Sequence, residues 1–190
     1  MRQKATRHVL PILLGLLAVP LTSCMTSKLQ PASGVAVETP GAASDNGIGI
    51  RVGGRAWSGD PAVLRYAAPL HVTINNDSGH PIRLQYESFA LVYGQDDSVS
   101  PPLTPEAVET TWPYWDHESA IAGPPPRRRV NLDMSLVLPE GVLASGEQVA
   151  GFLFFRRIVN NTNDIRFWVI LNDAQSGVPV ARISIPLTAE

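Results

Sequence analysis

The chain has 190 residues, one cysteine and a formal net charge of −2, from 15 Lys+Arg against 17 Asp+Glu. A single cysteine excludes an internal disulfide framework, and this charge balance argues against nucleic acid as a partner. The charge is also uneven. The first 23 residues hold three basic residues and no acidic one, which leaves a net charge of −5 for the rest (Arg2, Lys4 and Arg7). We therefore expect little electrostatic attraction of the remaining chain to anionic lipid.

The chain begins with the pattern of an export signal. The three basic residues precede an almost wholly apolar run, residues 9–21. A transmembrane helix needs about 20 apolar residues, whereas this run is shorter and contains Pro11 and Pro20. A positive start, a short apolar run and small residues at its end are typical of a secretory signal peptide. The sequence thus predicts that residues 1–23 are removed on export.

The apolar run ends in Leu21-Thr22-Ser23-Cys24. This segment resembles the lipobox of bacterial lipoproteins, in which a diacylglycerol is attached to the cysteine by a thioether before cleavage in front of it. The resemblance implies that Cys24 becomes the lipid-bearing first residue, held in a membrane by two or three acyl chains. Met25 follows instead of Asp, which in a host with two membranes implies the outer membrane. We therefore expect a lipid-anchored protein of the cell envelope.

Residues 24–46 are rich in Ser, Ala, Gly and Pro and contain few large apolar side chains. Such a segment buries too little surface to fold alone, and it is predicted to be a flexible tether. A flexible chain of roughly 22 residues spans on the order of 26 Å. The tether would hold one ordinary domain, residues 47–190, clear of the lipid headgroups.

The domain has the alternation of β-strands, with apolar residues at every second position. The phase slips near Ser88, where a bulge or kink is expected. The run 148–155 is apolar on both faces, which suits a central strand. Thr104-Pro105-Glu106 predicts the start of a short helix, with Thr as its cap. Seven or eight strands in all predict a two-sheet sandwich, with a barrel as the alternative, at residues 48–52, 70–74, 82–93 (with the slip), 130–138, 148–155, 165–171 and 178–187.

Two segments carry a resemblance to a known domain. One runs from Asn75 to Leu84 and continues in residues 89–92, and the other comprises residues 143–147 and 151–155. Together they resemble the immunoglobulin-like domain of many uncharacterised bacterial lipoproteins, which implies an immunoglobulin-like β-sandwich. Their glycine, Asn and Asp residues set turns, and Gly151 would let a neighbouring element approach closely. The resemblance brings no catalytic residue and no cofactor with it.

A long loop is expected at about residues 94–126, and it contains Trp112, Tyr114 and Trp115. Exposed aromatic side chains are typical of binding hot spots, so these three are candidates for binding a protein or glycan partner in the envelope. The alternative is that they fold back and cap one end of the core.

The same loop contains Asp116-His117-Glu118. These side chains offer metal ligands or a proton relay, although adjacent loop residues rarely converge on one ion. Further on, the run 127–129 holds three arginines, which suit either anion binding or protection of a sheet edge. The leading hypothesis is a lipoprotein with a non-catalytic binding or structural role and no bound metal. An envelope hydrolase or metal-handling protein that uses residues 94–126 is the alternative.

Overall fold

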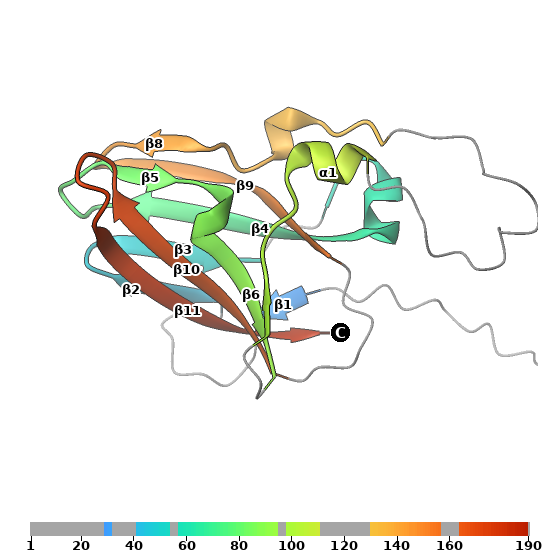
Figure 1. Ribbon diagram of the computed structural model, residues 1–190, viewed down its shortest axis with the longest axis horizontal. Helices are drawn as coiled ribbons and strands as arrows, with labels where there is room; N and C mark the ends of the chain where they lie inside the picture. Colours follow the sequence, from blue (N-terminus) through green and yellow to red (C-terminus); the bar gives the residue numbers. More distant parts are fainter. Residues whose placement is uncertain are drawn as a thin grey trace, which may run out of the picture.

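The computed structural model describes residues 29–31, 41–53, 57–94, 98–110, 130–156 and 164–189. Within them, two antiparallel sheets face each other (Figure 1), and their apolar side chains meet in one shared core. The predicted all-β sandwich is therefore confirmed.

The smaller sheet has four strands in the order β2-β3-β4-β9. Its members are β2 (Ala42–Asp45), β3 (Ile48–Val52), β4 (Ala67–Asn76) and β9 (Glu147–Arg156). The β4 and β9 strands pair over all ten residues of each. We call this the four-stranded sheet.

The larger sheet has seven strands and is centred on β10, which pairs with β11 on one side and with both β5 and β6 on the other. In Figure 1, β10 and β11 lie in front of the four-stranded sheet. The outermost strands β1, β7 and β8 have only three residues each. The members are β1 (Leu29–Pro31), β5 (Ile82–Leu84), β6 (Phe89–Tyr93), β7 (Ser98–Ser100), β8 (Gly141–Leu143), β10 (Ile165–Asp173) and β11 (Pro179–Ala189).

The described strands are more numerous than the seven or eight predicted, because some are too short to show alternation. The strand predicted at residues 82–93 is divided into β5 and β6. A 3-10 turn at Tyr86–Ser88 separates β5 from β6. Leu84 faces the core before the turn and Phe89 faces it afterwards, so the turn absorbs the predicted phase slip in place of a bulge.

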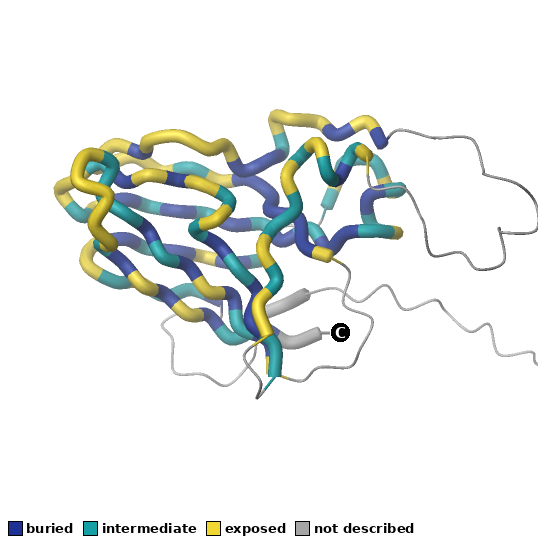
Figure 2. The backbone as a smooth tube through the Cα atoms, viewed as in Figure 1, coloured by how far each residue is buried: buried dark blue, intermediate teal, exposed yellow. Residues whose placement is uncertain are grey.

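Large apolar side chains from both sheets fill the main core. Phe167 of β10 stacks on Phe89 at a centroid distance of 6.1 Å and meets Phe155 of β9 edge-on at 6.3 Å. In Figure 2, buried and more exposed residues alternate along the strands of the larger sheet. Because complete burial of one such side chain contributes roughly 1.5–3 kcal/mol, this layer dominates the stability of the fold.

A second group of buried residues, the outer cluster, covers the outer face of β4 and β9. Trp57 meets Phe152 and Phe154 of β9 edge-on, with ring centroids 5.1 and 5.4 Å away. The predicted burial of β9 on both faces is thus confirmed for residues 151–155. Its predicted central position is wrong, because β9 is the last strand of its sheet. The cluster's buried members are Val63, Ala67, Val108, Val130, Leu132, Val137, Phe152 and Phe154.

The strand predicted at residues 130–138 is also wrong. Its middle forms a 3-10 turn, Met134–Leu136, because the Asp133 carboxylate accepts hydrogen bonds from the Ser135 backbone N–H (3.0 Å) and hydroxyl (2.7 Å). Of the strand pattern, Val137 keeps one isolated parallel bridge to Phe152. Val130, Leu132 and Val137 pack in the outer cluster, whereas Leu138 packs in the main core, so these apolar residues do not share one sheet face.

The predicted tether at residues 24–46 is too long. Residues 42–45 form β2 on the edge of β3, and residues 29–31 form β1 on the edge of β11. Asn46 adds a side-chain hydrogen bond to the Val180 carbonyl across the sandwich edge (2.8 Å). Both strands join these edges through backbone hydrogen bonds, which do not require a pattern of apolar side chains. The ordered domain therefore begins before residue 47.

The predicted loop at residues 94–126 contains two described elements, β7 and the short helix α1 (Pro105–Thr110). The predicted cap is confirmed, because Thr104 Oγ1 accepts the Ala107 backbone N–H at 3.2 Å. Val108 of this helix is buried in the outer cluster.

Candidate functional site

The residues predicted to carry function lie outside the described residues. The structure therefore does not place them relative to one another, and their roles stay predictions. They are the lipobox Leu21, Thr22 and Ser23, the lipidation site Cys24, the aromatic residues Trp112, Tyr114 and Trp115, the polar residues Asp116, His117 and Glu118, and the arginine run 127–129.

The structure does show where the aromatic segment is attached. Val108, before it, and Val130, after it, are both buried in the outer cluster. The described residues on either side of the aromatic segment therefore meet at this cluster, which covers the four-stranded sheet.

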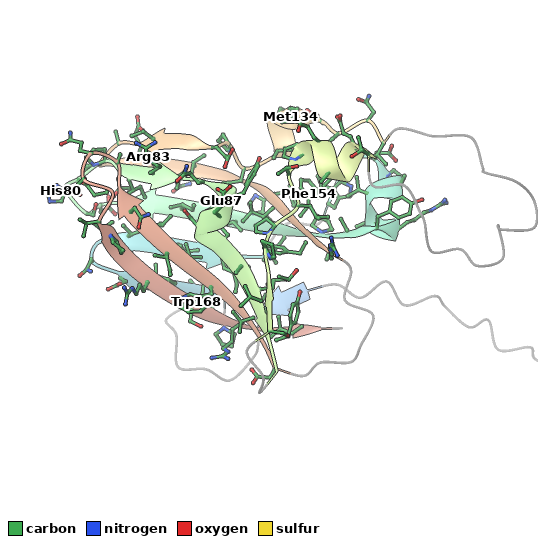
Figure 3. The ribbon with its side chains drawn as sticks, in the orientation of Figure 1. His80, Arg83, Glu87, Met134, Phe154 and Trp168 are labelled. Carbon is green, nitrogen blue, oxygen red and sulfur yellow. The ribbon has the colours of Figure 1, made fainter. Side chains whose placement is uncertain are left out.

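The turns beside His80 form a polar network around Asn76 (Figure 3 labels His80). The Asn76 side chain is fully buried and donates to the carbonyls of His80 (2.8 Å) and Leu143 (3.0 Å). Its Oδ1 accepts from the Ser78 backbone N–H (3.2 Å) and hydroxyl (2.7 Å). Because these four bonds satisfy the amide, its role is to join two turns.

Asp173 organises the neighbouring turn between β10 and β11. Its carboxylate accepts from the Ser176 backbone N–H (2.7 Å), the Ser176 hydroxyl (2.8 Å) and the Gln175 backbone N–H (3.0 Å). The bonds from Ser176 are the main reason that the pKa of Asp173 is lowered, and the nearby His80 contributes less. This carboxylate therefore shapes a turn.

In the described part of the chain, no three His, Cys, Asp or Glu side chains form a group that could hold a metal ion. A shallow depression of about 160 Å³ lies between β5 and β8, and Arg83 and Glu140 are among its lining residues. No helix among the described residues is both long and apolar enough to cross a membrane.

The outer face of the larger sheet is the described surface with the clearest binding chemistry. Trp168 points outward from the middle of β10 and is 41 % exposed, although its neighbours Phe167 and Val169 are buried. Ala90 and Ser184 lie directly opposite it on β6 and β11. Because both are small, neither covers the indole ring. Figure 3 shows Trp168 on this sheet.

Three arginines share this sheet face with Trp168. Arg166 lies two residues away on β10, and Arg182 is opposite Ile170 on β11, one step diagonally from Trp168. Arg83 of β5 adds a third cation further along the sheet, with its Nη2 2.9 Å from the Ala174 carbonyl. We call the outward positions around these four residues the Trp168 face.

No carboxylate occupies an outward strand position of the Trp168 face within the described residues. Three carboxylates border it: Glu87 on the turn between β5 and β6, Glu140 in the depression that Arg83 also lines, and Asp45, which accepts the Arg182 backbone N–H at 2.9 Å. Trp168 and these arginines were not among the predicted site residues, although a Trp at an outward position of an alternating strand is a signal visible in the sequence.

The described residues define an all-β protein with two facing sheets. Two solved structures from Bacillus subtilis are similar. A candidate lipoprotein, ycdA, aligns with a TM-score of 0.48 and 14% identity over 78% of this chain and 38% of its own. The yjhA protein aligns with a TM-score of 0.43 and 15% identity over 71% of this chain and 82% of its own. This chain thus spans well under half the length of ycdA.

No protein-family model and no curated protein sequence matches this chain.

Proposed function

We propose that this chain is a lipoprotein of the cell envelope, anchored through Cys24, whose β-sandwich has a non-catalytic binding or structural role. The observation that carries the proposal is Leu21-Thr22-Ser23-Cys24 directly after a short apolar run, with Cys24 as the only cysteine. Two or three acyl chains on one residue make membrane attachment effectively permanent. The outer membrane is the expected destination in a host with two membranes, because Met25 follows Cys24.

We further propose that the sandwich is immunoglobulin-like. The order β3-β4-β9 in one sheet and β11-β10-β6 in the other supports this. In chain order these six strands take the places of the A, B, E and G, F, C strands of an immunoglobulin fold. In that fold, binding is carried by loops or by a sheet face and not by a fixed catalytic constellation. Trp112, Tyr114 and Trp115 remain the candidates for a protein or glycan partner.

The lipidation step can be tested by moving the thiol. The full-length chain would be expressed in a bacterium as wild type, as Cys24→Ser, and as Cys24→Ser with Ser27→Cys. The double variant keeps one cysteine but removes it from the lipobox. Detergent phase partitioning and intact mass spectrometry would follow the product.

The wild type should lose residues 1–23, gain a diacylglycerol and enter the detergent phase. Neither variant should gain a diacylglycerol, and both should keep residues 1–23, because cleavage follows lipid attachment. Their apolar leader can itself enter detergent, so the intact mass decides the outcome. A wild type with a bare thiol at Cys24, or a Cys24→Ser variant that still carries a diacylglycerol, would disprove the proposal.

A further inference from the structure

We propose that the Trp168 face docks on an anionic lipid surface, so that the domain lies against the membrane that anchors it. This inference rests on the proposed lipidation of Cys24. A domain docked in this way lies at the lipid headgroups and is not held clear of them by a long tether. The lipid surface is then the binding partner of the Trp168 face.

The short chain between Cys24 and β1 limits how far the domain can lie from the membrane. Leu29, the first residue of β1, follows Cys24 by five residues and pairs with Ala189 on the edge of the larger sheet. Five residues of fully extended chain span at most about 18 Å. A lipid on Cys24 therefore keeps the β1 edge within that distance of the bilayer.

The Trp168 face belongs to the same sheet as β1. Only β11 separates β1 from β10, and neighbouring strands lie about 4.8 Å apart. Trp168 is opposite Ser184, three residues before Leu187, the partner of Pro31. The face is thus close enough to the anchored edge to contact the same membrane.

The positive charge of the Trp168 face also suits an anionic lipid surface. The chain after the signal has a net charge of −5, yet the outward positions of the Trp168 face hold Arg83, Arg166 and Arg182. The overall charge conceals this asymmetry. Guanidinium groups bind phosphate oxygens well, and basic residues near an anionic leaflet are attracted to it over about a Debye length.

The side chain of Trp168 also suits the boundary between lipid and water. An indole has an apolar ring and one polar N–H, and Trp is enriched where membrane meets water. Trp57 shows the contrasting case, because it packs into the outer cluster and donates its Nε1–H to the Asp60 carbonyl at 2.9 Å. Trp168 packs into neither core group, and a lipid surface would accommodate both its ring and its N–H.

The opposite side of the sandwich suits this role less well. The outer cluster covers β4 and β9 there. On the neighbouring β3, Arg51 is exposed and no aromatic side chain accompanies it. Arg51 is therefore a matched control position, exposed on the sheet that should face away from the membrane.

The test uses the lipidated full-length protein in vesicles of phosphatidylethanolamine and phosphatidylglycerol. A nitroxide is attached to Ser184→Cys or, as control, to Arg51→Cys. Its collisions are measured with oxygen, which enters lipid, and with a nickel chelate, which stays in water. Acylated Cys24 does not react with the label, so a second label on the protein would reveal failure of the lipidation proposal separately.

We expect the label at position 184 to show a severalfold loss of nickel collisions and a gain of oxygen collisions, with the label at position 51 open to water. Adding Trp168→Ala or Arg182→Gln should return the label at position 184 to water. Vesicles of phosphatidylcholine alone should weaken the effect.

Equal exposure of the two labels to the chelate would overturn the inference. So would loss of both nickel and oxygen collisions at position 184, because that pattern indicates a protein covering the face. The inference would also be overturned if the label at position 184 remained fully protected from the nickel chelate in both the Trp168→Ala and the Arg182→Gln variants.

Discussion

The backbone of Leu138 lies directly against Gly151. A Cβ atom on Gly151 would be 2.4 Å from the Leu138 nitrogen, and that nitrogen donates to the Phe152 carbonyl at 3.0 Å. Here the chain passes around the edge of β9, from Val137 in the outer cluster to Leu138 in the main core. The close approach predicted for Gly151 is confirmed.

Gly151→Ala should destabilise the protein by about 2–4 kcal/mol, because the new methyl group meets backbone atoms that cannot rotate away. Urea denaturation followed by circular dichroism would measure it. Gly49→Ala is the matched control, since a Cβ on that strand glycine meets nothing closer than Asn75 Cβ at 3.9 Å. Similar losses for the two variants would contradict the steric explanation.

Asn76→Ala should cost about 2–3 kcal/mol, because it leaves the carbonyls of His80 and Leu143 without the donor that joins their turns. Thermal unfolding would report the loss. The adjacent Asn75, which is less buried and bonds to the Asp77 carboxylate, should tolerate Ala within about 0.5 kcal/mol. If Asn75→Ala proved the more harmful change, the assigned role of the buried amide would be wrong.

The two described tryptophans should behave oppositely. Trp57→Ala removes the ring that packs on Phe152 and Phe154 and should cost about 2–3 kcal/mol. Trp168→Ala removes an outward side chain and should change the free energy of unfolding by less than about 1 kcal/mol. Chemical denaturation of the vesicle-free protein compares them, and a larger loss for Trp168→Ala would show that its side chain has a structural role.

Acid should loosen the turn between β10 and β11. The lowered pKa of Asp173, caused chiefly by its bonds from Ser176, means that the folded state favours the carboxylate. This stability is present above the unfolded pKa of about 3.8 and is lost as the pH falls through the lower folded value. Asp173→Asn should therefore reduce the acid sensitivity of amide exchange at Ser176, as measured by NMR. An unchanged pH profile would count against this role.

The triple variant Trp112→Ala, Tyr114→Ala and Trp115→Ala separates the two readings of the aromatic segment. If the aromatic residues bind an envelope partner, the free energy of unfolding should stay within about 1 kcal/mol of wild type while crosslinking to that partner in intact cells is lost. A loss of several kcal/mol would instead support the alternative that the aromatic residues cap the core.

Alternation was sufficient to predict the long strands, because β3, β4, β10 and β11 each bury one face against the core. It failed at residues 130–138, where apolar residues divide between two layers and Asp133 forms a turn. It also missed β1 and β2, whose pairing is made by the backbone and leaves no side-chain pattern. Trp168 went unnoticed for a related reason, since its setting depends on Ala90 and Ser184 from other strands.

The pairing of Leu29 with Ala189 also has a mechanical consequence. The first and last strands of the domain run antiparallel, so both chain ends leave the ladder at the same point. A pulling force between Cys24, the proposed point of lipid attachment, and the C-terminus would open β1 from β11 one residue pair at a time, without shearing the whole ladder. With only three pairs to open, this joint should yield before the sandwich does, and it would lengthen the connection between Cys24 and the folded domain under load.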